Sequence, residues 1–258
     1  IVIGDMRDTG GGALTQLYYN LTFLNRNVRF VALHTLYEQL CHRIPPSLIS
    51  AGWILENASR QPHYFYTFIK RAIDIVGGVV LGMFSLIFYP FVIFAIKKND
   101  NGPVFISQER VGQYNKPMRT IKFRTMTGVD DNESALESKL EITPIGRFLR
   151  KTRIDELPQL WNIVKGDLSF VGPRPEIPSI VAVYAEKIPY YNMRHLIKPG
   201  LSGWAQINNY DVPKKGVDIE RTVEKLSFDL FYLKRRSLLL DIEIVLKTIA
   251  TLLSRSGT

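Results

Sequence analysis

The chain has 258 residues, of which 46% are hydrophobic and 22% are charged, so it can bury a core in one or two domains. Its formal net charge of +9 predicts anionic partners: nucleic acid, phosphorylated metabolites or an anionic membrane surface. Lone Cys41 excludes an intramolecular disulfide and is typical of a reducing compartment. We expect this cysteine to be a small buried hydrophobe.

Residues 1–62 are predicted to form part of an α/β layer, because short apolar runs alternate with helical patterns. The expected strands are residues 1–4 and 28–33, and the expected helices are residues 14–24 and 35–41. The glycines at 10–12 fit neither the dinucleotide fingerprint nor a P-loop, which favours a flexible turn. Since the chain starts at Ile1 rather than methionine, we expect a fragment or a processed form. We interpret residues 1–62 as the tail and linker of an N-terminal accessory region.

An apolar segment without any charged residue runs from Ile75 to Ile96, and about 20 apolar residues suffice to cross the hydrocarbon core of a bilayer. Pairs of cations lie on both sides, at 70–71 and 97–98, so the positive-inside rule gives no orientation. Pro90 lies inside the run and should bend a helix. We therefore favour a re-entrant helix-break-helix over a single spanning helix, and a buried soluble helix is the third alternative.

A basic run follows, with two aromatic residues among its cations. It comprises Arg110, Lys116, Arg119, Lys122 and Arg124. The pattern is compatible with single-stranded nucleic acid, with a surface near anionic lipid, or with a phosphate site, and alone it does not decide among them. Residues 145–153 then predict an amphipathic helix, apolar on one side and basic on the other, of the kind that lies in a membrane interface.

The stretch from Thr152 to Pro175 carries the strongest chemical signal. Asp155 and Glu156 precede apolar residues at helical spacing, and Gly166 is placed to end that helix. We expect a position at a helix N-terminus to lower the pKa of both acids, with support from a nearby arginine at 150 or 153. The alternative interpretation is ordinary charge complementation of a helix end.

Arg174 lies between two prolines, which limit where its backbone can go. A preorganised guanidinium suits a bidentate contact with a phosphate. The alternative is an ion pair with Asp167 or Glu176. Together with the two carboxylates, this arginine indicates a site for a phosphate and a metal ion.

Two features of the C-terminal third leave several interpretations open. Trp204, in a loop with two glycines, could stack on a base, lie at a lipid interface or pack in the core. His195 is interpreted as structural or surface-exposed rather than as a general base. Residues 222–233 are predicted to form a helix that carries Asp229. Residues 238–253 predict a strongly apolar helix, half buried against the domain and half against lipid.

Five segments occur in the order and spacing of one family. They are KRAIDIVGG, GPVFISQERVG, IKFRTM, RIDELPQLWNIVKGDLSFVGPRP and KPGLSGWAQI. Residues 63–258 thereby resemble the bacterial sugar transferases of the monotopic phosphoglycosyltransferase type. The resemblance implies transfer of a sugar 1-phosphate from a UDP-sugar to undecaprenyl phosphate, with release of UMP. This reaction starts lipid-linked glycan synthesis, for exopolysaccharide, capsule or O-antigen.

The resemblance also implies roles for individual residues. Asp155 matches the family nucleophile, which forms an aspartyl phosphosugar intermediate, and Glu156 matches the partner carboxylate linked with Mg2+. Arg174 matches the arginine of a phosphate-binding Pro-Arg-Pro loop. Basic family positions around the substrate match Lys122, Arg124 and Arg150. Pro90 matches the proline that breaks the re-entrant helix, but Tyr89 stands where many members have serine.

We therefore expect a helix-rich α/β fold in which residues 63–258 form a membrane-associated domain, anchored by a re-entrant helix-break-helix and interfacial amphipathic helices. The expected partners are a UDP-sugar, undecaprenyl phosphate and membrane lipids, without nucleic acid, and a homo-oligomer is possible. The expected location is the bacterial inner membrane, with the active site on its cytoplasmic face. The rival function is a noncatalytic membrane scaffold that binds anionic lipids. No stretch carries a readable code for the sugar.

Overall fold

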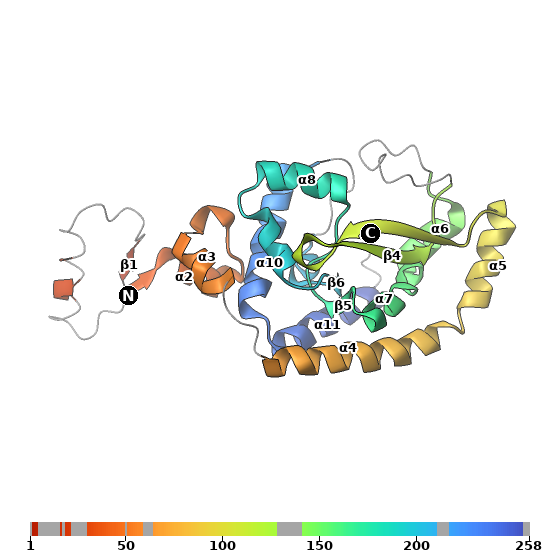
Figure 1. The fold of residues 1–258 in the computed structure, drawn as a ribbon, viewed down its shortest axis with the longest axis horizontal. Helices are drawn as coiled ribbons and strands as arrows, with labels where there is room; N and C mark the ends of the chain where they lie inside the picture. The colour runs from red at the N-terminus through yellow and green to blue at the C-terminus, as the bar shows by residue number, and fades with distance from the viewer. Residues whose placement is uncertain are drawn as a thin grey trace.

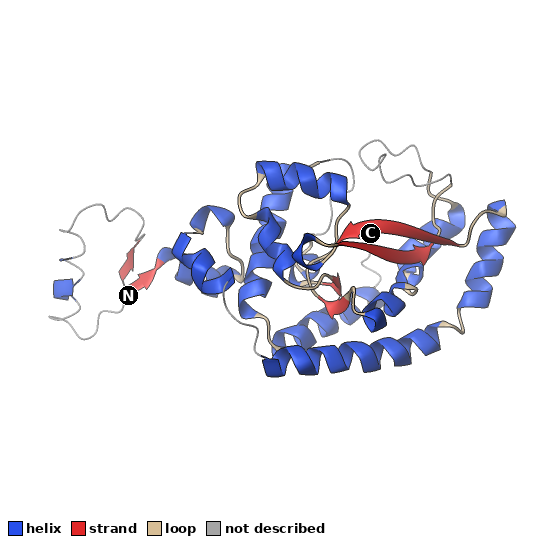
Figure 2. Cartoon of the chain, viewed as in Figure 1, coloured by secondary structure: helices blue, strands red, loops and turns tan. Residues whose placement is uncertain are grey.

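The computed structural model describes residues 2–4, 16, 19–21, 30–49, 51–58, 64–127, 141–210 and 217–254. Helices dominate this part of the chain, and its strands pair into three two-stranded sheets. Figure 2 shows the helices around the short strands. The prediction of a helix-rich α/β fold is confirmed to this extent.

The described N-terminal elements match both predicted strands and the second predicted helix. β1 (Val2–Gly4) pairs in parallel with β2 (Phe30–Ala32), which leads into α2 (Leu33–Cys41). Most of the helix expected at 14–24 lies outside the described residues. Cys41 is exposed, so the expectation of a buried cysteine is wrong. The reason is that α2 turns Glu38, rather than its last residue, toward the rest of the protein.

The segment after α2 packs directly against the remainder of the chain (Figure 1). It contains a short 3-10 turn, η2 (Pro46–Leu48), and α3 (Ala51–Ala58). Ile44, Ile49 and Trp53 are buried in the largest hydrophobic cluster of the protein. Residues upstream of position 63 therefore contribute to the same core as the residues that follow.

The apolar segment forms two helices with a sharp bend between them. α4 (Tyr64–Ser85) and α5 (Tyr89–Asp100) meet at 56°, and Pro90 lies in the first turn of α5. Among the described residues, neither helix alone has the length and apolar character to span a membrane, whereas the bent pair together does. The break occurs where the proline predicts it. Placement of the pair in a membrane stays a prediction.

α4 packs closely on α7 (Gln159–Lys165) because small residues let the backbones approach. A Cβ atom on Gly78 would lie 2.9 Å from Val164 Cγ2, and Gly82 faces the indole ring of Trp161. Arg71 of α4 donates from Nη1 to the Ile163 carbonyl and from Nη2 to the next carbonyl, both at 2.7 Å. These bonds satisfy carbonyl groups that the end of α7 leaves free.

A β-hairpin carries most of the basic run. β3 (Phe105–Val111) and β4 (Pro117–Phe123) are antiparallel and are joined through the short turn η3 (Gln113–Asn115). α6 (Pro144–Thr152) follows the hairpin, and the Thr143 side chain caps it by accepting a bond from the Gly146 amide. Leu149 of α6 is buried while Arg147, Arg150 and Lys151 are exposed, as the amphipathic pattern predicts, and Phe148 is exposed as well.

The C-terminal half surrounds the third sheet, in which β5 (Ser169–Val171) pairs in parallel with β6 (Gly200–Ser202). Between these strands lie α8 (Pro178–Lys187) and the 3-10 helix η6 (Tyr191–Leu196). After them come α9 (Trp204–Ile207), α10 (Ile219–Arg235) and α11 (Leu238–Leu253). The two long helices have the bounds expected from their apolar periodicity to within a few residues.

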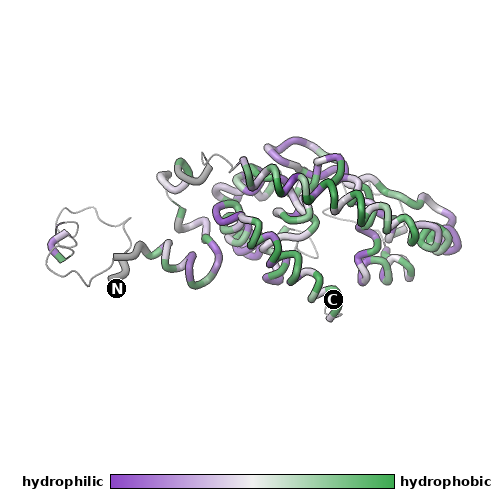
Figure 3. Tube along the Cα trace, turned by 90° about the horizontal axis from the view of Figure 1, so that it is seen from below, coloured by the Kyte–Doolittle hydropathy of each residue, from purple (hydrophilic) through white to green (hydrophobic). Residues whose placement is uncertain are grey.

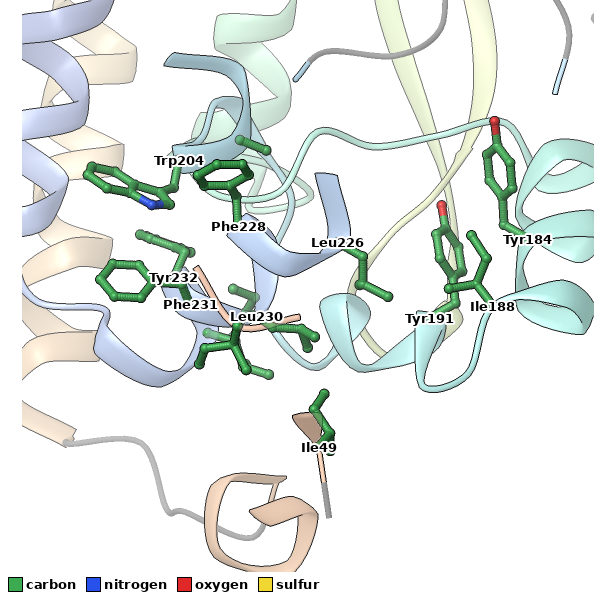
Figure 4. Packing of buried hydrophobic residues seen from close by; sticks show 14 of the residues in the cluster. Ile49, Tyr184, Ile188, Tyr191, Trp204, Leu226, Phe228, Leu230, Phe231 and Tyr232 are labelled. Carbon is green, nitrogen blue, oxygen red and sulfur yellow. The ribbon is translucent and has the colours of Figure 1, made fainter. Parts of the chain in front are cut away.

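The largest core cluster is built around α10, as Figure 4 shows. Trp204 belongs to it: its indole is buried, stacks on Phe231 with 5.6 Å between ring centroids, and donates from Nε1 to the His42 carbonyl at 2.8 Å. Of the three interpretations of this tryptophan, core packing is confirmed. A stacking platform for a base would need an exposed ring.

Besides the buried core, the protein has an exposed apolar surface, which runs along α4, α5 and α11. Figure 3, seen from below Figure 1, brings α4 to the front and shows hydrophobic residues along it. The large exposed side chains include Phe65, Phe68, Val80, Phe84, Phe91, Phe94, Leu239, Leu246 and Leu253. The start of α11 is tied to α4 by Asp241, which accepts from Lys70 Nζ at 2.7 Å and from Tyr66 at 3.0 Å. Exposed apolar area of this extent marks an interaction surface.

Candidate active site

The two carboxylates lie in a turn of their own between α6 and α7. The chain leaves α6 through Arg153, whose φ of 57° is left-handed, and enters a short 3-10 turn, η5 (Ile154–Glu156). The prediction that Asp155 and Glu156 begin the following helix is therefore wrong in detail. Pro158 lacks an amide hydrogen and stands at the start of α7, which separates the two elements. The predicted end is confirmed, since Gly166 caps α7 with φ of 100°.

Glu156 is held by arginines. Its Oε1 accepts from Arg174 Nη2 at 2.9 Å and lies 3.4 Å from Arg153 Nη1. Burial acts to raise the pKa of this carboxyl, but Arg174 and then Arg153 outweigh it, so the pKa lies below its ordinary value. Glu156 is thus an ionised carboxylate at neutral pH. Of the alternative partners of Arg174, Asp167 forms an ion pair with Lys165, and Glu176 forms ion pairs with Arg194 and Lys225.

Asp155 has the opposite electrostatic character. Its side chain is only 7% exposed, and its Oδ1 is buried without a hydrogen-bond partner among the described residues. Burial first and then repulsion by Glu156 raise the pKa of Asp155 to about 6, against the attraction of Lys122. The expected lowering by a helix N-terminus is wrong, because η5 places the group beside a second carboxylate and under protein.

A pocket that is open to solvent lies beside Glu156, and Asp155 is not among its lining residues. Its lining residues are Arg110, Thr120, Lys122, Glu156, Gln159, Arg174, Pro175 and Gly200. Three cations thus face one carboxylate, which suits a strongly anionic ligand such as a diphosphate. Burial, followed by repulsion from Arg110 and Arg174, lowers the pKa of Lys122 to about 8. A bound anion would relieve this crowding of positive charge.

The structure brings three of the expected residues together, namely Lys122, Glu156 and Arg174, and adds Arg110, Thr120 and Gln159 to them. Strand alternation contains the signal for Arg110. The register pairs Gln108 with Thr120 and Arg110 with Met118, so even-numbered residues of the hairpin share one face. Lys122 is on that face as well.

The two remaining expected arginines lie outside the lining of the pocket. Arg124 follows the end of β4 and is buried, with its guanidinium packed on Gly102, where a Cβ atom would lie 2.4 Å from Nη1. Arg150 donates from Nε to Thr125 Oγ1 at 2.9 Å. Arg150 is also close enough to Asp155 to act against the rise of its pKa.

The donor set determines which metal could bind. The described residues contain no group of three or more His, Cys, Asp and Glu side chains placed to hold an ion. Mg2+ needs fewer protein ligands, since it takes one or two carboxylates and completes its shell with water and substrate phosphates. Glu156 and the unpartnered Oδ1 of Asp155 fit this reduced set. The residues present are therefore compatible with Mg2+ held jointly with an anionic substrate.

His195 is a structural residue. It is buried, its Nδ1 lies 2.5 Å from Asn115 Oδ1, and its ring meets Tyr191 edge-on. Burial and the neighbouring Arg194 lower its pKa to about 3, so it is neutral at physiological pH. This agrees with the interpretation that it is not a general base.

Comparison with known proteins supplies an independent view. The family model described as bacterial sugar transferase matches residues 65–255. A UDP-N-acetylgalactosamine-undecaprenyl-phosphate N-acetylgalactosaminephosphotransferase of Aeromonas hydrophila is 40% identical over 203 residues, which cover 77% of this chain and 47% of that protein. An uncharacterised sugar transferase of Bacillus subtilis, EpsL, is 37% identical over 190 residues, covering 73% of this chain and 89% of that protein.

A third relative is the UDP-glucose:undecaprenyl-phosphate glucose-1-phosphate transferase of Escherichia coli. It is 36% identical over 185 residues, which cover 70% of this chain and 39% of that protein. The matched region therefore spans less than half of the Aeromonas and Escherichia proteins and most of the Bacillus one.

Proposed function

This chain belongs to the bacterial sugar transferase family, and we propose that it transfers a sugar 1-phosphate from a UDP-sugar to undecaprenyl phosphate, releasing UMP. The names of the Aeromonas and Escherichia relatives describe reactions of this type. The structural observation that supports it most directly is the pocket in which Arg110, Lys122 and Arg174 converge on Glu156, the residue next to Asp155. Its charge matches the diphosphate of such a donor.

Asp155 is the proposed nucleophile of a two-step reaction. A diphosphate resists attack because its oxygens are negative, so the barrier falls when nearby cations neutralise them. One carboxylate oxygen of Asp155 attacks the phosphorus that carries the sugar, and the bond from this phosphorus to the bridging oxygen breaks. UMP leaves with that oxygen. A phosphate oxygen of undecaprenyl phosphate then attacks the aspartyl phosphosugar and releases Asp155, which leaves a polyprenyl diphosphate sugar.

The electrostatic contrast within the pair supports this division of roles. With a pKa of about 6, Asp155 is ionised at neutral pH, and its Oδ1 has no hydrogen bond to give up. Glu156 stays ionised and holds Arg174 over the pocket. Glu156, with Asp155, is the proposed ligand set for Mg2+, which would neutralise charge on the diphosphate oxygens. Arg174, Lys122 and Arg110 bind and orient the phosphates.

We further propose that residues 63–258 form the membrane-bound transferase domain, with α4, α5 and α11 in contact with lipid. The exposed apolar side chains of these helices support this placement. In a re-entrant arrangement, Lys70 and Arg71 lie on the same side of the membrane as Lys97 and Lys98, which is the cytoplasmic side by the positive-inside rule. Accessibility tags on both ends of the bent pair should then report the cytoplasm, and a periplasmic tag at either end would refute the arrangement.

The reaction is tested with purified protein, undecaprenyl phosphate and a panel of UDP-sugars, by measuring UMP release. The wild type should release UMP with at least one sugar, and chelation of Mg2+ should stop the release. Asp155→Asn should abolish it, whereas Glu243→Gln, at an exposed acid of α11 paired with Lys247, should not change it. A noncatalytic scaffold would bind anionic vesicles equally well in all variants and release no UMP in any of them.

The covalent step is tested separately. With a UDP-sugar labelled in its sugar-linked phosphate and no acceptor lipid, the wild type should carry the label and Asp155→Asn should not. UMP release that needs the acceptor lipid, together with an unlabelled protein, would indicate direct displacement.

A further inference from the structure

A buried charged cluster lies directly behind the Pro-Arg-Pro loop (residues 173–175). We propose that Arg194 of η6, anchored by Asp229 of α10, is a positioning residue that fixes the backbone of Arg174. The inference takes one point from the proposed function, namely that Arg174 binds a phosphate of the substrate. It assigns a role in the reaction to residues that do not line the pocket.

The guanidinium of Arg194 is 1% exposed and joins three parts of the chain. Its Nε donates to Asp229 Oδ2 at 2.9 Å, which fixes it to α10. Its Nη1 donates to the Tyr191 hydroxyl at 3.1 Å and lies 3.2 Å from Glu176 Oε1. Its Nη2 donates to the backbone carbonyl of Arg174 at 2.9 Å. The last bond is the connection to the active site.

The cluster balances its charge internally. Two acids, Glu176 and Asp229, are paired with two bases, Arg194 and Lys225, and all four side chains are at most 2% exposed. Lys225 and Tyr191 both donate to Glu176. Buried ion clusters of this kind are seldom more stable than apolar packing of the same volume. Stability alone is therefore a weak explanation for this buried cluster. Its specific effect is to hold hydrogen-bond donors in fixed positions facing the Pro-Arg-Pro loop.

Every carbonyl group from 173 to 176 accepts a hydrogen bond, so the loop has little freedom. The donors, in chain order of the carbonyls, are the Gly200 amide at 3.0 Å, Arg194 Nη2 at 2.9 Å, Arg110 Nη1 at 3.4 Å and the Val111 amide at 2.9 Å. The bond to Arg174 itself comes from the charged cluster. With both flanking residues proline, this bond sets the direction in which the Arg174 side chain leaves toward Glu156.

A purely structural role for Arg194 would be to hold η6 against α10. The two roles differ in one respect: positioning acts through Arg174, so it disappears when the Arg174 side chain is removed. A double-mutant cycle measures this dependence.

We would replace Arg194 by lysine, which keeps the positive charge but has one ammonium nitrogen in place of the three separate nitrogens that reach Asp229, Tyr191 and the Arg174 carbonyl. In the protein that retains Arg174, Arg194→Lys should lower kcat/KM roughly 10- to 100-fold, as expected for residues within one hydrogen-bonded network. In the Arg174→Ala variant, the same Arg194→Lys change should lower kcat/KM by less than about 3-fold. Equal losses in both backgrounds would overturn the proposal. The matched control is Glu38→Gln, because Glu38 is a buried acid paired with Lys234 and Arg235 of α10, away from the loop.

Hydrogen–deuterium exchange gives a readout that does not need activity. Peptides covering residues 172–176 should exchange faster in Arg194→Lys than in the wild type, and should not change in Glu38→Gln. Unchanged exchange in Arg194→Lys would overturn the proposal even if the enzyme is active. If the wild type releases no UMP, the proposed function fails, while faster exchange would still support the positioning role.

Tyr191→Phe is the second variant if the lysine variant does not fold. It removes only the hydroxyl that connects Arg194 with Glu176. The same pattern of non-additivity with Arg174→Ala is expected at smaller amplitude, and additivity would count against the proposal.

Discussion

Lowering the pH should destabilise this protein through His195. The imidazole is 6% exposed, and its Nε2 is buried without a hydrogen-bond partner among the described residues. A proton added there would place a second buried cation beside Arg194. Burial, and after it this repulsion, is what lowers the pKa to about 3.

The sign and size of the effect follow from proton linkage. An unfolded histidine has a pKa of about 6.5, so between pH 6.5 and about 3 the unfolded chain binds more protons than the folded protein. Stability from this residue is therefore complete above pH 6.5 and is lost as the pH falls. At pH 5 the loss is about 2 kcal/mol, from 1.5 pH units at roughly 1.4 kcal/mol each. For a domain of this size that lowers Tm by about 4–8 °C.

The assay is thermal unfolding in detergent between pH 7.5 and 5, for the wild type and for His195→Gln. Glutamine keeps an amide near Asn115 but does not titrate in this range. Taking the difference in Tm between the two proteins removes the contribution of all other titrating groups. As the pH falls, the Tm of the wild type should decrease more than the Tm of His195→Gln. Parallel curves would mean that His195 takes up its proton in the folded state, which would refute the buried, neutral assignment.

Three further predictions test the packing and the pocket. Gly78→Val should destabilise the protein by about 1–3 kcal/mol, because the new side chain meets Val164 across the contact between α4 and α7; an unchanged Tm would contradict this packing. Asp74→Ala removes the acceptor of the Ser169 hydroxyl and a neighbouring amide, so a loss of about 2–4 kcal/mol is expected in the same assay, and a loss under 1 kcal/mol would contradict it. Arg110→Gln should raise KM for the UDP-sugar roughly 10- to 100-fold, from the loss of a charge-assisted bond to phosphate, and an unchanged KM would remove Arg110 from the binding site.

Periodicity in the sequence predicted the elements whose apolar face continues over several turns. α6, α10 and α11 have nearly the expected bounds, and the helix break occurs beside Pro90. The direction in which the pKa of Asp155 is shifted could not be predicted in this way. It depends first on burial and then on repulsion by Glu156, and the opposing attraction comes from Lys122, which lies on a strand that is distant in the sequence. Local sequence indicates a helix N-terminus there, whereas tertiary packing decides the pKa.

The basic run shows the same limit for binding residues. A motif match treats Lys122 and Arg124 alike, since both are cations in one short segment. The hairpin separates them: Lys122 is inside β4 and faces the pocket with Arg110, whereas Arg124 comes after the strand ends and packs on Gly102. Period-2 alternation across the pair of strands would have selected Arg110, but only once the register of the hairpin was known.

α4 connects the exposed apolar surface with both halves of the site. Arg71 bonds the carbonyls at the end of α7, the helix that directly follows the carboxylate pair. Asp74 accepts bonds from Ser169 and Phe170 of β5, the strand that leads into the Pro-Arg-Pro loop. Because buried charges are costly unless they are paired, these two residues are explained by the groups they hold rather than by the apolar helix that carries them. α4 therefore holds together the two segments that carry Glu156 and Arg174, so this helix is part of the framework that sets the geometry of the site.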